Sequence, residues 1–486
     1  MVVGTAAKSD HTINQKNVIF NAKRLIGRKF EDPNVQGLIL NCPYQVELVD
    51  ETPCFKVETG GGKFKHLAPQ VVSAKILKKL KTTAEDYLHE SVDSAVITVP
   101  AYFTDGQRLA TKEAAEIAGF RVLQLQNEPT AAALAYHWQQ PCDRPQTLLV
   151  FDLGGGTFDV CIITVKGGEI LVKAVEGDGY LGGEDFDLNL VNYCIQEFEN
   201  AYTLKVQNNP TNELQSKQYR RSWGRLKNAV EDGKKTLSST TQVTLALDGW
   251  YGGHDLHVEL TRAKFEELND ALFSKAMLVV DRTMKAANIG EDEIDHVVLV
   301  GGSSRIPKIR ELLGKKFGQL KLRERINADE AVAYGAAIHA AMLNGLNEQR
   351  VKGISLSNVV PASIGIGLSS GQFNKLAVKN MITPFTVEQS YCCPDGGKMK
   401  IRIYEGEHND VSQNHKLGVF ELQGQQKSGD MQIVFHMDRD GILTVSGKYP
   451  EGMGHGGNEV KVIDYRKRLT EAQIEAIKKE AVEENN

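Results

Sequence analysis

The residues with the clearest chemical potential lie in the segment FDLGGGTFDV, from Phe151 to Val160. Its three consecutive glycines have no side chains, so backbone N–H groups can approach an anionic ligand closely. Asp152 and Asp159 flank the glycines at a spacing suited to the water shell of Mg²⁺, an ion that keeps most of its waters beside phosphates. Three glycines between strands are also a common tight turn. The two acids and Thr157 favour the phosphate site over the plain turn.

A second pair of glycines, Gly301 and Gly302, follows the apolar run HVVLV and precedes SSRIPKIRELL. This order predicts a strand that ends at the glycines and a helix that continues through Leu313. A helix N-terminus attracts anions through its free N–H groups and its dipole. Taken alone, however, the pair is better explained as a tight turn between a strand and a helix.

The elements around these glycines alternate between strands and helices. Apolar runs predict strands at Ala95–Pro100, Gln146–Asp152, Thr157–Val165, Glu169–Glu176 and Asp295–Val300. An amphipathic helix is predicted over Pro69–Glu90 from the helical spacing of Val72, Ile76, Leu80 and Leu88. A second helix is predicted over Asp105–Ala118. Strands that alternate with long helices indicate an α/β domain up to about Leu346.

The pattern changes after residue 358. Residues 359–465 contain many glycines, few helical signals and short strand-like runs, which is typical of a β-sandwich. These runs are SIGIGL, KMKIRIYEGE, VFELQG, MQIVFHM, GILTVSG and EVKVIDY. In residues 466–486, Thr470 precedes Gln473 by three positions and apolar residues recur at helical spacing. This last segment is therefore predicted to be a short C-terminal helix.

The composition excludes several classes of protein. A chain of 486 residues is too long for one hydrophobic core, so we expect two or more domains. The net charge of −5 and the scattered basic residues give no sign of a nucleic-acid partner. The seven cysteines show no C-x-x-C spacing, so neither a disulfide framework nor a zinc site is indicated. Without a signal peptide or an apolar run near 18 residues, we expect no membrane association and a reducing compartment, the cytoplasm or nucleus.

Seven motifs occur in order along the chain: AVITVPAYFTDGQR, NEPTAAALAY, FDLGGGTFDV, LGGEDFD, KKTLSS, LVGGSSRIPKI and INADEAVAYGAA. In this series the chain resembles the seventy-kilodalton heat-shock chaperone family (Hsp70) of the actin and sugar-kinase superfamily. The resemblance runs from about Thr5 to the C-terminus and is densest before Leu346. It implies an actin-like α/β ATPase domain at residues 1–346, an interdomain linker at 347–358, a β-sandwich peptide-binding domain at 359–465 and the start of a helical lid at 466–486.

The resemblance also implies roles for individual residues at the phosphates. Lys23 matches the lysine that orients the attacking water and the γ-phosphate, and Glu128 and Asp152 match the acids around magnesium and water. The second phosphate loop of the family is matched by Gly154, Gly155, Gly156 and Thr157, and Thr157 is also a candidate catalytic residue. Asp159 matches a further acid, so Asp152 and Asp159 are expected to hold magnesium through water.

An adenosine pocket is implied further along the chain. One wall is matched by Glu231, Lys234, Lys235 and Ser238, and the opposite wall by Gly302, Ser303, Arg305 and Asp329. An arginine plane and the aliphatic stems of lysines can enclose a purine, while a glycine turn admits the sugar and phosphate. Pro100 and Arg108 match the pair that relays the nucleotide state between domains.

In the β-region, the resemblance implies a groove for an extended peptide. The residues that match this groove are Ile366, Leu368, Tyr391, Met399 and Ile401. Such a groove combines strand-like backbone bonding with an apolar side-chain pocket. Without the resemblance, these residues would be interpreted as sandwich core.

Two features depart from the family pattern. The family opens with a strand and hairpin of the type G-I-D-L-G-T-T, the first phosphate loop, and nothing in this sequence matches it. We therefore expect an incomplete first lobe and impaired hydrolysis. The linker is usually acidic and rich in leucine, whereas here it reads GISLSNVVP, so we expect weaker docking between the domains.

The sequence thus predicts an ATP-dependent molecular chaperone that binds unfolded polypeptides and couples this binding to ATP binding and hydrolysis. ATP or ADP and magnesium are the expected cofactors. J-domain co-chaperones and nucleotide-exchange factors are the partners that the family implies. Two alternatives stay open: a non-hydrolysing protein that binds peptides or other chaperones, and an incomplete gene product. The unmatched first loop favours the alternatives, and the intact second loop favours the ATPase.

Overall fold

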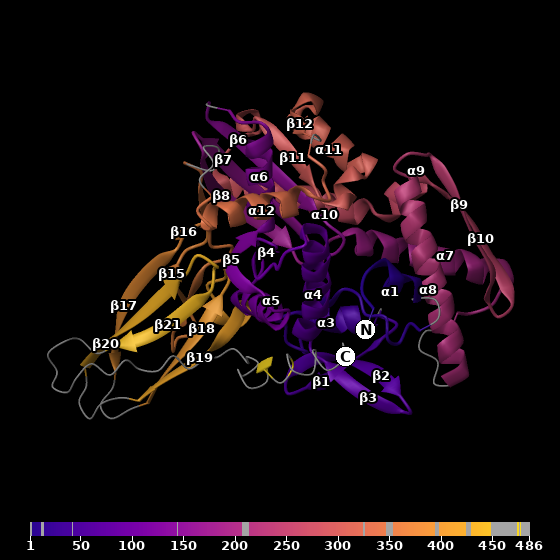
Figure 1. Cartoon of the computed structure of the whole chain (residues 1–486), viewed down its shortest axis with the longest axis horizontal. Coiled ribbons are helices and arrows are strands. Elements are labelled where there is room, and N and C mark those ends of the chain that lie inside the picture. Colours follow the sequence, from indigo (N-terminus) through magenta and orange to yellow (C-terminus); the bar gives the residue numbers. More distant parts are fainter. Residues whose placement is uncertain are drawn as a thin grey trace.

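The computed structural model describes residues 2–10, 14–40, 42–142, 144–206, 213–323, 326–346, 353–393, 398–423, 429–448, 474–475 and 477. Its largest sheet is seven-stranded and mixed, in the order β12-β11-β6-β7-β8-β13-β16 (Figure 1). The strands are β6 (Gln146–Leu153), β7 (Phe158–Lys166), β8 (Glu169–Asp178), β11 (His296–Val300), β12 (Leu322–Arg323), β13 (Ser355–Val359) and β16 (Ile382–Thr383). The predicted strands at β6, β7, β8 and β11 are confirmed to within two residues at each end.

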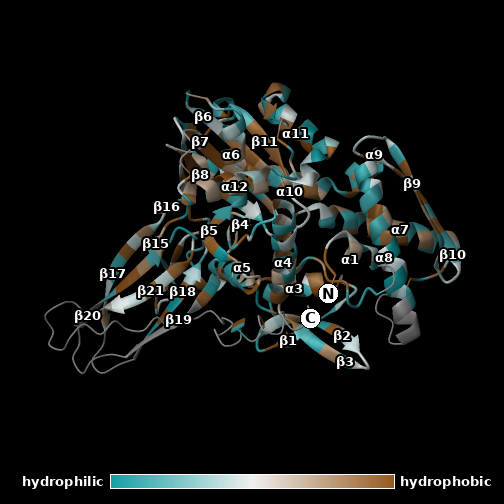
Figure 2. Ribbon diagram, viewed as in Figure 1, coloured by the Kyte–Doolittle hydropathy of each residue, from teal (hydrophilic) through white to brown (hydrophobic). Residues whose placement is uncertain are grey.

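Both faces of this sheet are buried, which explains the continuous apolar runs in its strands. Leu149 and Phe151 pack into a core shared with the helices α7 (Gly183–Tyr202), α8 (Glu213–Thr236), α10 (Asp270–Ala287) and α11 (Pro307–Phe317). Leu148 and Val150 alternate with them and pack on the opposite face, in a core shared with α6 (Glu128–Gln139) and α12 (Ala331–Leu343). Brown ribbon marks the apolar strands β6, β7 and β11 in Figure 2.

The residues before β6 form several smaller elements. Besides α6, the helices are α1 (Thr5–Ser9), α2 (Ala22–Leu25), α3 (Pro33–Leu40), α4 (Pro69–Leu88) and α5 (Asp105–Ile117). An antiparallel sheet is made by β1 (Gln45–Val49), β2 (Thr52–Gly60) and β3 (Lys63–Leu67), and a parallel pair by β4 (Ser94–Val99) and β5 (Arg121–Asn127). Helix α5 and strand β4 confirm two of the three predictions made for this region, and the third concerns α4. After α8 follow the hairpin β9 (Gln242–Tyr251) and β10 (His254–Thr261) and helix α9 (Arg262–Leu268).

Helix α4 is present where predicted, but its apolar residues do not lie as expected. Val72 is buried, whereas Ile76, Leu80 and Leu88 are 46%, 59% and 56% exposed. The helix ends two residues earlier than predicted, where His89 adopts a left-handed conformation. The spacing therefore identified the helix correctly, while most of its apolar stripe stays uncovered in the part of the chain that the structure describes.

The residues after β13 form two antiparallel sheets around one core. The orders are β15-β14-β18-β19 and β17-β20-β21. The strands are β14 (Ile364–Gly367), β15 (Phe373–Ala377), β17 (Phe385–Cys393), β18 (Lys398–Glu405), β19 (His415–Gln423), β20 (Gly429–Met437) and β21 (Leu443–Lys448). Five of the six predicted strands are confirmed, β15 and β17 were not predicted, and EVKVIDY lies outside the described residues.

The predicted linker does not behave as expected from its composition. Residues 347–352 lie outside the described part, but Ser355–Val359 forms β13, which pairs in parallel with β8 and antiparallel with β16. The composition of the linker did not indicate this strand, whereas the expectation of weaker docking between the domains stays a prediction. Main-chain hydrogen bonds hold β13, and they do not require acidic or leucine side chains.

The predicted C-terminal helix lies mostly outside the described residues, and so does its cap, Thr470. Ile474, Glu475 and Ile477 are helical. The side chains of Ile474 and Ile477 pack against the apolar cluster of α4, α5, β4 and β5. Among the residues described, no helix is both long and apolar enough to span a membrane.

Candidate nucleotide site

The two glycine turns lie side by side because their strands do. β11 runs parallel to β6 with Val300 opposite Asp152, so both strands reach their turns at the same edge of the sheet. Gly301 has a φ of +79°, and a Cβ atom there would lie 2.3 Å from the carbonyl oxygen of Leu153. Only glycine fits this close approach. The sheet therefore brings both glycine motifs to one place.

The turn of the first glycine motif is held by its carbonyl groups. The Gly154 carbonyl accepts hydrogen bonds from the Gly183 amide and the Ser303 hydroxyl, both at 3.0 Å. The Gly155 carbonyl accepts from the Glu184 amide at 2.9 Å. The Gly156 carbonyl accepts from the Nε of Arg24 at 3.0 Å. Three carbonyls are thus bonded to protein donors, which fixes the turn in a single conformation.

Asp152 and Asp159 lie directly opposite each other across the β6–β7 hairpin. Both are buried, with 8% and 2% of their surface exposed. Burial, followed by the nearby carboxylates of Glu128 and Asp159, raises the pKa of Asp152 well above its ordinary value. Burial also raises the pKa of Asp159 to about 7, with Glu128 adding to the effect. Two buried carboxylates that repel each other form a site that a cation would stabilise.

Lys23 and Glu128 come from distant parts of the chain and form an ion pair of 2.6 Å. Glu128 begins helix α6, where the helix dipole favours a negative charge. Burial opposes the charged form of Lys23, but Glu128 and then Asp152 and Asp159 raise its pKa above the ordinary value. The Lys23 side chain is nevertheless half exposed, so the cluster opens to solvent on the lysine side. The structure thus brings Lys23, Glu128, Asp152 and Asp159 together.

The acidic cluster fits magnesium only through water. No group of three or more His, Cys, Asp and Glu side chains in the described part of the chain could hold a metal ion directly. Asp152 and Asp159 instead present two carboxylates next to the glycine turn. This arrangement suits Mg²⁺, which takes few protein ligands when phosphates and water complete its shell.

The residues expected at the adenosine lie on helix α8 and on the second glycine turn. The ammonium group of Lys234 is buried, where it contacts Asp187 at 2.8 Å and the Gly183 carbonyl at 2.9 Å. Lys235 and Lys8 both pair with Glu231, at 2.5 and 2.7 Å. Burial would raise the pKa of Glu231, but these lysines lower it to about 2. Lys234 therefore holds the first turn of α7, whose Gly183 amide bonds to the first glycine turn, whereas Glu231 and Lys235 lie nearer the surface.

The opposite wall is a small network of its own. Arg305 pairs with Asp329 at 2.7 Å and donates to the Asn327 side chain at 3.1 Å. A Cβ atom at Gly302 would lie 3.3 Å from the Asp329 carboxylate, so this turn stays narrow. Ser303 bonds to the first turn, as described above. Ser238 is half-buried and lies two residues after the end of α8, where its amide donates to the Lys235 carbonyl at 3.1 Å.

A cavity of about 740 Å³ lies between the N-terminal elements and α8. Its lining includes Phe20, Val72, Lys8, Lys227 and Glu231. The volume is within the range of sites for small ligands. Of the residues predicted at the adenosine, Glu231 alone lines this cavity, and the Lys8–Glu231 ion pair joins its two sides.

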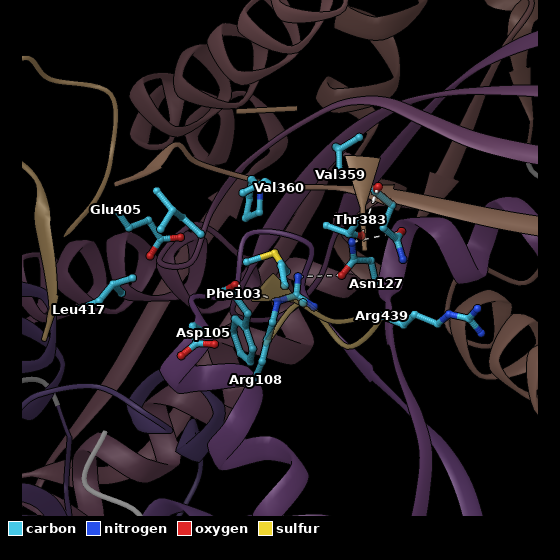
Figure 3. Close-up of a pocket in the computed structure, with 15 residues that line it drawn as sticks. Phe103, Asp105, Arg108, Asn127, Val359, Val360, Thr383, Glu405, Leu417 and Arg439 are labelled. Atoms are coloured by element: carbon cyan, nitrogen blue, oxygen red, sulfur yellow. Dashed lines mark hydrogen bonds between the residues drawn. The ribbon is translucent and has the colours of Figure 1, made fainter. Parts of the chain in front are cut away.

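Arg108, one of the two predicted relay residues, is buried where the sandwich meets the central part (Figure 3). Its guanidinium donates to the side chain of Asn127 at 2.8 Å and to the carbonyls of Ala101 and Asp440 at 3.1 and 3.3 Å. Pro100 is buried next to Ala101. Asn127 directly precedes Glu128 and also donates to Asn358 of β13 at 3.3 Å. Hydrogen bonds thus connect the sandwich to Asn127, and the peptide bond from Asn127 to Glu128 continues this connection to the acid cluster.

The residues expected in the peptide groove do not form one surface. Ile366 and Ile401 are buried in the core of the sandwich, and Tyr391 packs partly against that core and bonds to Asn374. Leu368 follows β14 and is 38% exposed. The backbone of Met399 lies in β18, but its side chain is outside the described residues. Leu368 is therefore the one residue of this set that is described as exposed at its surface.

Comparison with known proteins assigns the chain to a family. The sequence model of the Hsp70 protein family matches residues 1–486. A heat shock 70 kDa protein of Neurospora crassa is 40% identical over 487 residues, which are 99% of this chain and 73% of that protein. The ribosome-associated molecular chaperone SSB of Candida glabrata is 39% identical over 490 residues, 99% of this chain and 78% of that protein.

The chain belongs to the Hsp70 family of molecular chaperones. Hsp70 proteins in general bind ATP or ADP with magnesium. The resemblance inferred from the seven motifs is thereby confirmed. The assignment rests on the match over residues 1–486 and not on any single motif.

Sequence reasoning missed three residues of this candidate site: Arg24, Asp185 and Asp187. Arg24 follows Lys23 and its guanidinium bonds to both the Gly156 carbonyl and Asp185. Asp187 pairs with Lys234, and burial raises the pKa of Asp187 to about 6 although the lysine opposes this. Asp185 and Asp187 both belong to the motif LGGEDFD. The acidic residues of this motif were a signal from which both could have been predicted.

Proposed function

We propose that this Hsp70-family chain is an ATP-dependent chaperone that binds ATP with magnesium at the paired glycine turns and an extended polypeptide in the β-sandwich. The observation that supports this most is the anchoring of the first turn. Its carbonyls at Gly154, Gly155 and Gly156 are bonded to protein, and the Gly154 amide donates to the Thr157 carbonyl at 3.0 Å, so the amides of Gly155 and Gly156 are the groups proposed to meet phosphate oxygens. Oriented N–H groups in a fixed turn stabilise the charge of a transferring phosphoryl group.

In this proposal each residue acts through position and charge. Lys23 neutralises the phosphate and orients water, and Glu128 holds Lys23 through their ion pair. Asp152 and Asp159 hold magnesium through its water shell, and the ion supplies charge neutralisation at the phosphates. Thr157 directly follows the three glycines and, in this proposal, faces the phosphates together with them. Hydrolysis then proceeds in line, with water as the attacking group.

Coupling between the two sites is proposed to run through Arg108. Its bonds reach Asn127 beside Glu128 on one side and Asp440 of the sandwich on the other. If Glu128 moves on ATP binding, Asn127 would move with it. The hydrogen bonds from Asn127 to Arg108 and from Arg108 to Asp440 would then displace the sandwich. Coupling of two sites through one such element is what allosteric control requires.

The test uses the whole chain in three measurements. Calorimetry would measure ADP and ATP affinity with magnesium, single-turnover assays would measure ATP hydrolysis, and fluorescence anisotropy would measure the affinity for a leucine-rich peptide with and without ATP. We expect nucleotide binding and a lower peptide affinity in ATP. Absence of nucleotide binding would refute the proposal. Peptide binding without turnover would instead support a non-hydrolysing binding protein.

A further inference from the structure

Arg24 is a buried arginine placed directly between the two halves of the candidate site. It lies in helix α2, next to Lys23, but its side chain is 6% exposed whereas that of Lys23 is 50% exposed. Burying a guanidinium group is costly unless its donors are paired. The partners of Arg24 therefore show why the residue is held there.

The guanidinium of Arg24 contacts the phosphate turn and helix α7 at once. Its Nε donates to the Gly156 carbonyl at 3.0 Å. Its Nη1 and Nη2 donate to the two oxygens of Asp185 at 3.2 and 2.5 Å. This paired arrangement is the strongest geometry that an arginine makes with a carboxylate. A Cβ atom at Gly156 would lie 3.1 Å from the Arg24 Nε, so the arginine packs directly on the turn.

Asp185 connects Arg24 to the start of helix α7, which in turn bonds to the glycine turn. Its carboxylate also accepts a hydrogen bond from the Gly182 amide at 2.8 Å, at the start of α7. The next two amides of that helix end, Gly183 and Glu184, bond to the carbonyls of Gly154 and Gly155. Arg24, Asp185 and the phosphate turn thus form one hydrogen-bonded network.

We propose that Arg24 is a positioning residue that holds the Lys23 segment and the phosphate turn in a fixed relationship. The proposal rests on the proposed function, because it assumes that the turn binds phosphate. Arg24 itself would not touch the nucleotide. It keeps the Gly156 carbonyl turned away from the ligand, so that the amides of the turn stay aligned, and it fixes the backbone next to Lys23. A planar group with several donors is needed, which lysine cannot replace fully.

This role predicts a selective defect. In Arg24→Gln, the affinity for ADP with magnesium should fall about tenfold to a hundredfold, which is the loss of one or two charge-assisted hydrogen bonds. The affinity for adenosine, which has no phosphate, should stay within about twofold. Arg24→Lys should recover part of the ADP affinity. In single-turnover hydrolysis at saturating ATP, the rate of Arg24→Gln should also fall, because Lys23 loses its fixed position.

Arg28 provides the matched control. It lies four residues further on, after the end of α2, pairs with Asp32 at 3.2 Å and lies 5.1 Å from the centre of the Tyr180 ring. Arg28→Gln should leave the affinities for ADP and adenosine unchanged. Thermal unfolding of each variant should be followed by circular dichroism. If Arg24→Gln does not fold, Asp185→Asn, which keeps an oxygen for the Gly182 amide, should show the same selective loss.

The outcomes separate the two proposals. If the unaltered chain binds neither ADP nor adenosine, the proposed function is wrong and the role of Arg24 falls with it. If the chain binds ADP but Arg24→Gln binds it equally well, the proposed function stands and the role of Arg24 is refuted. Equal losses for ADP and adenosine in Arg24→Gln or in Asp185→Asn would show that the network only stabilises the fold, and this too would refute the proposal.

Discussion

Asp105 and Glu405, two carboxylic acids from α5 and β18, line the same small cavity between the central part and the sandwich (Figure 3). Burial raises the pKa of Glu405 to about 7, and Asp105 adds to this effect while Arg108 and Arg28 oppose it. The Asp105 carboxylate also accepts a hydrogen bond from the Leu443 amide of β21 at 2.6 Å. The contact between the two parts therefore contains an acid that titrates near neutral pH.

Docking of the sandwich should weaken as the pH rises. A freely exposed Glu405 would lose its proton near its ordinary pKa of 4.5, whereas the docked one keeps it up to about 7. Because the docked state binds more protons between these values, its stability falls across this range and levels off above it. Energy transfer between one fluorophore on the sandwich and one on the central part would measure docking as a function of pH. Glu405→Gln should flatten the pH profile, and Glu407→Gln, whose carboxylate has a lowered pKa, should not.

Substitution of Asp152 should weaken nucleotide binding in a magnesium-dependent way. Asp152→Asn removes one of the two buried carboxylates beside the turn, so ADP affinity with magnesium should fall about tenfold or more. Without magnesium the loss should be smaller, since one charge that repels phosphate is gone. Titrations of ADP into the unaltered chain and into Asp152→Asn, each with and without magnesium, would measure the two losses. Equal losses in both conditions would contradict the metal role.

Removal of Asp440 should uncouple the sandwich from the nucleotide. Its carboxylate accepts from the Leu125 amide at 2.8 Å and pairs with Lys112 at 2.7 Å. Asp440→Ala breaks both contacts, so peptide affinity should no longer respond to ATP. Peptide anisotropy with and without ATP is the measurement. Asp410→Ala is the control, because the Asp410 carboxylate bonds to Ser412 in its own loop, and here the response to ATP should persist.

The predicted peptide groove can be divided into core and surface. Ile401→Ala should destabilise the sandwich by about 2–5 kcal/mol, the usual cost of truncating a buried isoleucine. Leu368→Ser should leave stability almost unchanged and lower the affinity for an apolar peptide. Chemical denaturation and peptide anisotropy would measure the two effects. A Leu368→Ser variant with full peptide affinity would remove this residue from the groove.

The sequence predicted the central elements well because their signals are local. Apolar runs marked β6, β7, β8 and β11, and the glycines marked where two of them end. Strand β17 was missed, because three consecutive polar residues, Glu388, Gln389 and Ser390, interrupt its sequence FTVEQSYCC and leave neither an apolar run nor a regular alternation. Helix α4 was identified, but its exposed stripe was not, because burial depends on what packs against a helix.

The candidate site was predicted only in part for the same reason. Motif matching found Lys23, Glu128, Asp152 and Asp159, and the structure places these residues together. It missed Arg24, because a partner 161 residues away gives that arginine its position. The buried bond between Lys234 and Asp187 likewise depends on how α7 and α8 pack. Local patterns predict which residues can do chemistry, whereas long-range packing decides which of them are held rigidly.

The pairing of β13 with β8 has a consequence for how the connecting segment can vary. The amide of Ser355 donates to the Gly168 carbonyl at 3.1 Å, and the register continues with Leu356 opposite Ile170. The exposed side chain of Ser355 can therefore be exchanged without loss of attachment, since the peptide backbone makes the bond. Proline is the exception, because it has no amide hydrogen to donate. Mutational tolerance should thus be broad at Ser355 but end abruptly at proline, and it should be narrow at Asn358 and Val359, whose side chains bond to Asn127 and pack in the core.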